Sequence, residues 1–126
     1  MPHCIILWID QSVAKKFVLS KDAVETQVIR HKGKTEHHDH HPDRFNLIQN
    51  EELKHFFEDV AKNLSPNEDL LISGPGLAKT HFLAYLEKHH PPLAKTVLAE
   101  IVMDQSSDSE IVSAAKKYYE KRHIKL

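Results

Sequence analysis

The sequence predicts a single α/β domain over residues 1–126, built on a mixed five-stranded sheet with helices on its faces. Three observations predict this class. A chain of 126 residues, 40% hydrophobic and 28% charged, has the size and composition of one globular domain. Three short strand-like runs occupy its first 30 residues. Helical and strand-like patterns then alternate, which gives the order β-β-β-α-β-α-β-α.

The first three runs predict an antiparallel meander. Cys4 to Ile9 is continuously apolar, which is typical of a strand covered on both faces and therefore central in its sheet. Val13 to Leu19 and Ala23 to Ile29 mix apolar and polar residues, so we expect antiparallel strands with one wetter face each. The links at 10–12 and 20–22 are short enough for hairpins.

A polar loop and an amphipathic helix follow. Residues 31–44 hold no apolar side chain except the ring of Pro42, and they include Gly33, so we predict an exposed loop there. Apolar residues then recur three and four positions apart from Leu53 to Leu64, which predicts a helix that ends at Ser65-Pro66-Asn67.

The remaining elements alternate between strand and helix. Asp69 to Ser73 reads as a short strand that enters Gly74-Pro75-Gly76, and the helix that follows is expected to stop at Pro91-Pro92. Val97 to Met103 predicts the fifth strand. The polar turn from Asp104 to Asp108 then supplies the cap of a last helix with a basic C-terminal end.

Charge and cysteine content limit the classes of function. The formal net charge of -1 provides no general attraction to nucleic acid or to an anionic membrane, so a nucleic-acid site must be a local patch. The single cysteine, Cys4, excludes an internal disulfide and fits a reducing compartment; within its apolar run it reads as a small buried hydrophobe. We find no signal-peptide pattern and no apolar run near the roughly 20 residues that span a bilayer, and we expect a cytoplasmic protein without a membrane partner.

Histidine is the compositional outlier, with 11 residues, and it concentrates in the loop. His37, His38, His40 and His41 are candidate ligands for Zn or Ni, because imidazole suits both ions. Adjacent loop residues do not by themselves fix a coordination geometry, so we expect no required cofactor. A metal-binding or homo-oligomeric protein that uses this loop is one alternative for the function.

The same imidazoles, when protonated, suit RNA phosphates, so RNA binding is expected to increase below about pH 6.5. Lys79 joins them because it follows a strand end and begins a helix, where backbone N–H groups attract anions. The candidate RNA-contacting residues are Lys32, Lys34, His37, His38, His40, His41, Arg44 and Lys79. Ala78 stands where a nucleotide-binding P-loop needs glycine, so nucleotide hydrolysis is not predicted, and a tight turn remains the simpler interpretation of Gly74-Pro75-Gly76.

Two further patterns have both a functional and a structural interpretation. Asp10 and Asp104 each follow a strand, and such carboxylates hold Mg ions in ribonuclease-H-like nucleases, although acids at strand ends also form turns and caps. The basic C-terminal helix has Tyr118 and Tyr119 interleaved with Lys116, Lys117, Lys121, Arg122, His123 and Lys125. These residues suit RNA phosphates and base stacking, but cations also complement a helix C-terminus and tyrosine is often in the core.

Three segments together resemble the small bacterial relatives of the middle domain of archaeal and eukaryotic peptide-chain release factors. They are the stretch from Ile5 to Asp10 with Ala14 to Phe17, the stretch from Leu70 to Phe82, and the final stretch from Asp104 to Tyr119. The resemblance implies a ribonuclease-H-like mixed sheet with helices. It also implies that residues 31–44 occupy the place where release factors carry the catalytic Gly-Gly-Gln.

Residues 31–44 contain no Gly-Gly pair and no Gln, so peptide-release catalysis is not carried over. The resemblance therefore implies a translation-related binding module, more simply a binding protein than an enzyme, whose partner is ribosomal RNA, tRNA or a translation protein. The metal-dependent nuclease that would use Asp10 and Asp104 remains the enzymatic alternative.

Overall fold

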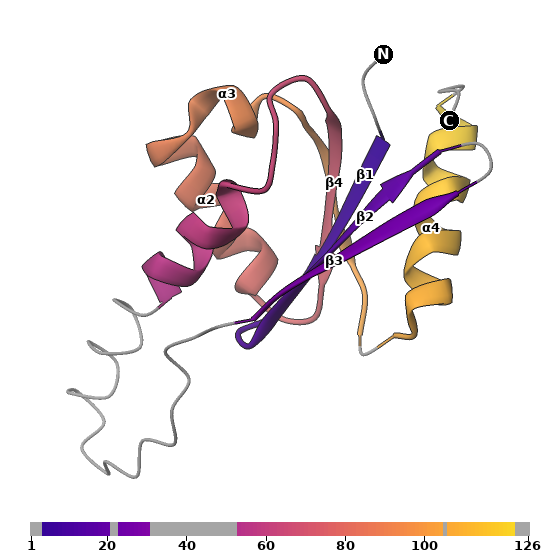
Figure 1. The fold of residues 1–126 in the computed structure, drawn as a ribbon, viewed down its shortest axis with the longest axis horizontal. Helices are drawn as coiled ribbons and strands as arrows, with labels where there is room; N and C mark the ends of the chain where they lie inside the picture. Colours follow the sequence, from indigo (N-terminus) through magenta and orange to yellow (C-terminus); the bar gives the residue numbers. More distant parts are fainter. Residues whose placement is uncertain (1–3, 21–22, 31–52, 105, 123–126) are drawn as a thin grey trace, which may run out of the picture.

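In the computed structural model, residues 4–20, 23–30, 53–104 and 106–122 are described. The strands are β1 (Cys4–Ile9), β2 (Val13–Leu19), β3 (Val24–Arg30), β4 (Asp69–Gly74) and β5 (Val97–Val102). The helices are α2 (Ala78–His89), α3 (Pro91–Ala94) and α4 (Asp108–Lys121), and residues 53–61 are also helical. Figure 1 shows their arrangement.

The five strands form one mixed sheet in the order β3-β2-β1-β4-β5. β1 pairs antiparallel with β2 and parallel with β4, and β5 pairs parallel with β4. The prediction that the apolar run from Cys4 to Ile9 is the central strand is therefore confirmed, and every residue of β1 is buried. The α/β class and the mixed five-stranded sheet are confirmed as well.

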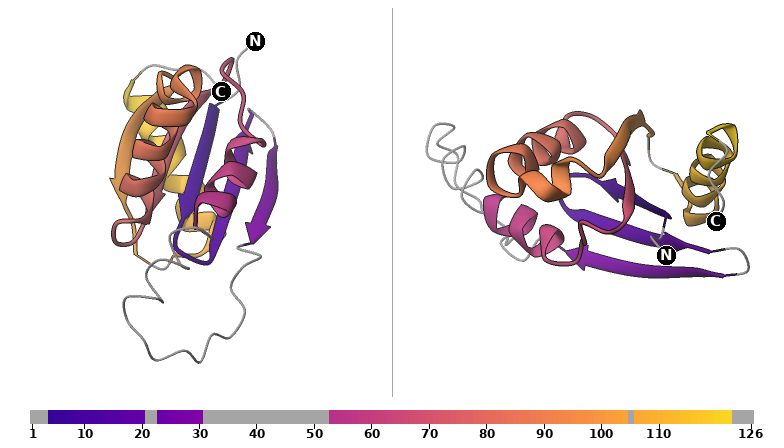
Figure 2. Two further views of the ribbon diagram at one scale, coloured as in Figure 1. Left: turned by 90° about the vertical axis from the view of Figure 1, so that its left-hand side faces the viewer. Right: turned by 90° about the horizontal axis from the view of Figure 1, so that it is seen from above.

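Helices cover both faces of the sheet, because the alternating side chains of β1 point to opposite sides. On one face Ile5, Leu7 and Ile9 pack with the helix over residues 53–61, with α2 and with α3. On the other face Cys4, Ile6 and Trp8 pack with α4. Figure 2 shows α4 on the opposite side of the sheet from the other helices. Each fully buried aliphatic side chain contributes about 1.5–3 kcal/mol to this double core.

Three details differ from the sequence prediction. Pro91-Pro92 does follow the end of α2 at His89, but the prolines also begin the extra helical turn α3, because a fixed φ suits the first turn of a helix. The sequence predicts one wetter face for β3, yet all its residues are exposed except Ile29, which is half-buried. Some limits also differ: β3 begins and ends one residue later than predicted, β4 ends one residue later, and β5 ends one residue earlier. The helix predicted to run up to Ser65 is helical only to Ala61.

Lys16 explains why β2 does not alternate cleanly. Lys16 is 9% exposed and lies on the same face of β2 as Ala14 and Val18, which belong to the core beneath the helix over residues 53–61. The ammonium donates a hydrogen bond to the carbonyl of Asn63 and lies 3.9 Å from Glu68 Oε1, so the charge is matched by oxygen atoms. None of the described helices is long and apolar enough to cross a membrane.

Candidate functional site

The candidate site lies at the edge of the sheet where β1 and β4 end. After β1 the chain reverses through Asp10, whose Oδ1 accepts hydrogen bonds from the backbone N–H groups of Ser12 at 2.7 Å and Val13 at 2.8 Å. The backbone N–H of Asp10 also donates to the carbonyl of Val13 at 3.0 Å. The Asp10 carboxylate therefore holds the predicted hairpin turn into β2, as short polar side chains do in turns.

A glycine turn follows β4 at the same edge. Gly74 has φ +142°, and a Cβ there would lie 2.1 Å from the carbonyl oxygen of Ile9. Gly76 has φ +59° and open space around its Cα. The first glycine is thus required for close approach of β1 and β4, and the second for a left-handed backbone. The interpretation of this segment as a tight turn is confirmed.

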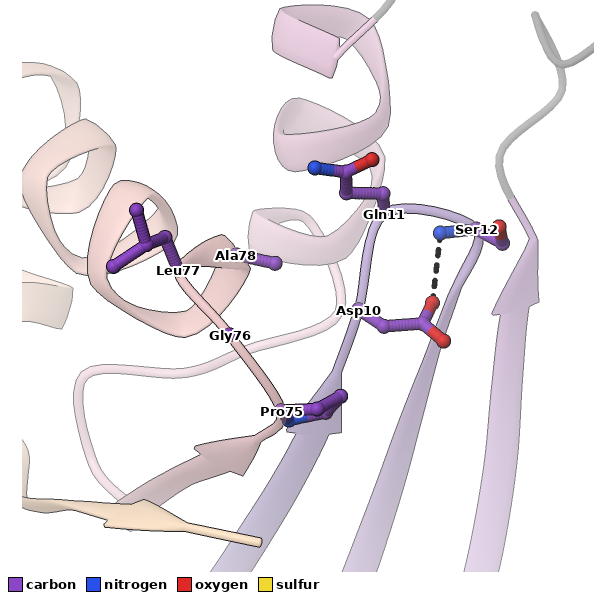
Figure 3. Close-up of a pocket in the computed structure, with 7 residues that line it drawn as sticks. All are labelled: Asp10, Gln11, Ser12, Pro75, Gly76, Leu77 and Ala78. Carbon is purple, nitrogen blue, oxygen red and sulfur yellow. Dashed lines mark hydrogen bonds between the residues drawn. The ribbon is translucent and has the colours of Figure 1, made fainter. Parts of the chain in front are cut away.

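The two turns enclose an open pocket of about 310 Å³, drawn in Figure 3. It is lined by Asp10, Gln11, Ser12, Pro75, Gly76, Leu77 and Ala78. The N-cap residue of α2, Leu77, makes no side-chain cap hydrogen bond, and the first turn of α2 has no acidic residue. The positive helix end and the Asp10 carboxylate thus border one pocket, which gives it a mixed electrostatic character.

Lys79 is the one candidate RNA-contacting residue that the structure describes. The residue is 5% exposed, and its ammonium donates a hydrogen bond to the carbonyl of Gly76. The ammonium is therefore hydrogen-bonded within its own turn. Contact between Lys79 and RNA stays a prediction.

The other candidates lie outside the described residues: Lys32, Lys34, His37, His38, His40, His41 and Arg44. The chain enters this segment from Arg30, the last residue of β3, which pairs with Val13 beside the β1–β2 turn. Arg30 therefore lies at the same end of the strands as Asp10 and the glycine turn.

The carboxylates of the nuclease alternative follow strands that are not neighbours. β4 lies between β1 and β5, so Asp10 and Asp104 follow strands about 10 Å apart, two spacings of roughly 4.8 Å. Asp108, the first residue of α4, forms an ion pair with Lys15 at 3.1 Å. Among the described residues, no three His, Cys, Asp or Glu side chains are grouped so that they could hold a metal ion.

The C-terminal helix uses its tyrosines for packing. Tyr119 is fully buried, and its hydroxyl lies 2.9 Å from the carbonyl oxygen of Ile5 and 3.2 Å from that of Asp69. Burial raises the pKa of Tyr119 well above its usual range. The functional interpretation that Tyr119 stacks on a base is therefore wrong, because its ring faces the sheet. Burial likewise raises the pKa of the Cys4 thiol, and Cys4 is a buried core residue as predicted.

Sequence reasoning missed a polar cluster between helices. Glu58 Oε1 accepts a hydrogen bond from the Tyr85 hydroxyl at 2.5 Å and lies 2.8 Å from His90 Nε2. The hydrogen bonds with His90 and Tyr85 lower the pKa of Glu58. Burial and the hydrogen bond to Glu58 raise the pKa of Tyr85 to about 12. The only sequence signal was a carboxylate on the amphipathic helix next to its apolar stripe.

No family model matches the chain. Among curated proteins, the Pelota homolog of Methanosphaera stadtmanae is 38% identical over 53 residues, which cover 40% of this chain and 15% of that protein. The Pelota homolog of Pyrococcus furiosus is 33% identical over 63 residues, which cover 45% of this chain and 18% of that protein. The matched stretches thus span less than a fifth of these relatives.

The solved structures extend the likeness to nearly the whole fold. Archaeoglobus fulgidus Pelota matches with a TM-score of 0.60 and 26% identity over 92% of this chain and 31% of that chain. An archaeal translation termination factor matches with a TM-score of 0.65 and 19% identity over 91% of this chain and 34% of that chain, which shows the fold alone. The chain therefore has the α/β fold of a translation-factor middle domain. Over the matched residues its sequence is similar to part of Pelota.

Proposed function

We propose that this chain is a translation-related binding module that contacts the ribosome, a tRNA or a translation factor without catalysing peptide release. The observation that supports it is the combined likeness to Archaeoglobus fulgidus Pelota, in which 92% of this chain superposes at 26% identity. The matched part of that Pelota is 31% of its chain, which is the size of one domain in a larger protein. The three glycines of this chain, Gly33, Gly74 and Gly76, form no Gly-Gly pair. Their spacing supports binding without Gly-Gly-Gln catalysis.

The contact is assigned to residues 31–44 together with the neighbouring sheet edge. Arg30, which precedes these residues in the sequence, and the β1–β2 turn lie at that edge, which also borders the pocket beside Asp10. The imidazoles at His37, His38, His40 and His41 would gain charge below about pH 6.5 and pair with phosphates.

Co-sedimentation of the full chain with purified ribosomes, and binding of labelled tRNA, test this proposal. We expect binding that weakens as salt rises and strengthens as the pH falls from 7.5 to 6. Replacing His37, His38, His40 and His41 together by alanine is expected to weaken it. The matched control is His55→Ala with His81→Ala, which removes exposed imidazoles from the helical layer. Unchanged binding in the fourfold variant, or equal loss in the control, would contradict the assignment.

A further inference from the structure

The lateral edge of the sheet formed by β3 borders a groove that shares only Arg30 with the contact surface of the proposed function. Among the described strands, β3 has β2 as its single neighbour, so its outer backbone edge carries N–H and C=O groups without a strand partner. Most of β3 is exposed, and Val28 is 45% exposed. An open edge of seven residues is a ready template for another strand.

The helix over residues 53–61 and the turn after it form the second wall. A pocket of about 440 Å³ lies between this wall and β3. It is lined by Val28, Ile29, Arg30, Asp59, Lys62 and Asn63. Ile29 packs against the core cluster below and supplies an apolar floor. The volume is within the range of side-chain and small-ligand pockets.

Hydrogen bonds hold the wall against the strand. Gln27 Nε2 donates to Asn63 Oδ1 at 2.6 Å, and Asn63 Nδ2 donates to the carbonyl of Asp59 at 2.8 Å. Lys16 also donates to the Asn63 carbonyl from the neighbouring strand β2. Asn63 therefore ties the turn after the helix to both β3 and β2. The groove has its shape before a ligand binds, which lowers the entropic cost of binding.

We propose that the groove between β3 and the helix over residues 53–61 binds an extended segment of a partner protein. The segment adds to β3 as a sixth strand, with an apolar side chain on Ile29 and an acidic side chain two positions away beside Lys62. Side chains two positions apart point to the same face of a strand. A strand edge between a sheet and a helix is a recurring peptide-binding geometry.

The chemistry of the groove favours a peptide over a nucleic acid. A strand edge presents both donors and acceptors, and a peptide backbone supplies the complement of both, whereas phosphates only accept. Arg30 and Lys62 outnumber Asp59 among the lining charges, which favours an acidic side chain. The Asp59 carboxylate opposes a chain of phosphates but tolerates a single acid placed on the Lys62 side.

Selection of phage-displayed random octapeptides on the full chain provides a probe for this groove. We expect the selected sequences to carry an acidic residue two positions from an apolar one. A synthetic selected peptide is then expected to bind Lys62→Glu about tenfold or more weakly than the original chain, and Lys62→Gln several-fold more weakly. Lys88→Glu, an exposed charge reversal on α2, is the matched control and should bind normally. Circular dichroism verifies that each variant is folded.

Backbone methylation separates strand addition from simple side-chain docking. Methyl groups on alternate peptide nitrogens block pairing with β3 in one frame and face away from it in the other. We expect one frame to abolish binding and the other to preserve it. Equal binding of both frames, normal binding by Lys62→Glu, or selection of basic peptides would overturn the proposal. Stronger competition by oligouridine RNA than by the peptide, or a homodimer that Lys62→Glu dissociates, would also overturn it. Ribosome binding is measured separately, so its loss or survival does not decide this result.

Discussion

At the scale of single residues, Gly74 allows the parallel strands β1 and β4 to lie close together at the point where they end. Gly74→Ala places a methyl group against the Ile9 carbonyl and also forces φ +142° on a residue with a Cβ. We expect a loss of about 3 kcal/mol or more in the free energy of unfolding. Gly76→Ala is the matched control, since only its φ of +59° is unfavourable, and it should cost about 1–2 kcal/mol. Urea denaturation measures both, and equal losses would contradict the role of close approach.

The neighbouring tyrosines of α4 give a second comparison at this scale. Tyr119→Phe removes a hydroxyl that reaches the carbonyls of β1 and β4, so we expect a loss of about 1–2 kcal/mol in thermal or urea unfolding. The Tyr118 hydroxyl is buried without a hydrogen-bond partner in the part of the chain that the structure describes. Tyr118→Phe is therefore expected to be neutral or slightly stabilising. A larger loss for Tyr118→Phe would show that its hydroxyl has a partner in solution.

At the scale of elements, Glu58 joins the helix over residues 53–61 to α2 and to His90, which precedes α3. Because its pKa is lowered in the folded state, its contribution to stability is present above the unfolded value of about 4.3 and is lost as the pH falls through the folded value. We expect Glu58→Gln to be less stable at pH 6 and to flatten the acid side of the stability curve. Glu87→Gln, at an exposed position of α2, should keep the original curve. Urea unfolding from pH 6 to pH 3 measures both.

Tyr85 predicts the alkaline side of the same curve. Its pKa is raised to about 12, so its contribution is present below the unfolded value of about 10 and is lost as the pH rises through about 12. Tyr85→Phe should therefore reduce the steepness of alkaline unfolding between pH 10 and 12. The measurement is urea unfolding in that range, monitored by circular dichroism. An unchanged slope would contradict a raised pKa of Tyr85 in the folded state.

Elements were predictable wherever local pattern and burial agree. The apolar run from Cys4 to Ile9 predicts a central strand, and the polar turn before α4 predicts a cap, which the structure places at Ser107 in a capping box with Glu110. Lys16 and Lys79 were not predictable as buried residues. Their ammonium groups are satisfied by carbonyls of Asn63 and Gly76, and such tertiary pairing leaves no trace in hydrophobic periodicity. The pocket at Asp10 required the parallel pairing of β1 with β4, which joins two turns far apart in sequence.

At the scale of the whole molecule, metal titration tests which histidines bind a metal ion. The described residues contain no group of three potential ligands, so a stoichiometric Zn or Ni site would have to draw on residues outside them. We expect calorimetric titration of chelator-treated protein to show no heat of stoichiometric metal binding when alanine replaces His37, His38, His40 and His41. His55→Ala with His81→Ala should leave that heat unchanged. Retained binding in the fourfold variant would place the metal elsewhere.

The position of β1 also has a consequence for biosynthesis. Its antiparallel partner follows at once, but its parallel partner begins at Asp69, and the hydroxyl that ties Ile5 to the final helix belongs to Tyr119. Translation proceeds at roughly 5–20 residues per second, so several seconds pass between the synthesis of β1 and that of β4. During this time the β1 edge that pairs with β4 has no partner strand. The nascent polypeptide therefore completes the core around β1 only after α4 has emerged from the ribosome, and a chain that stops before α4 exposes an apolar face and is prone to aggregate.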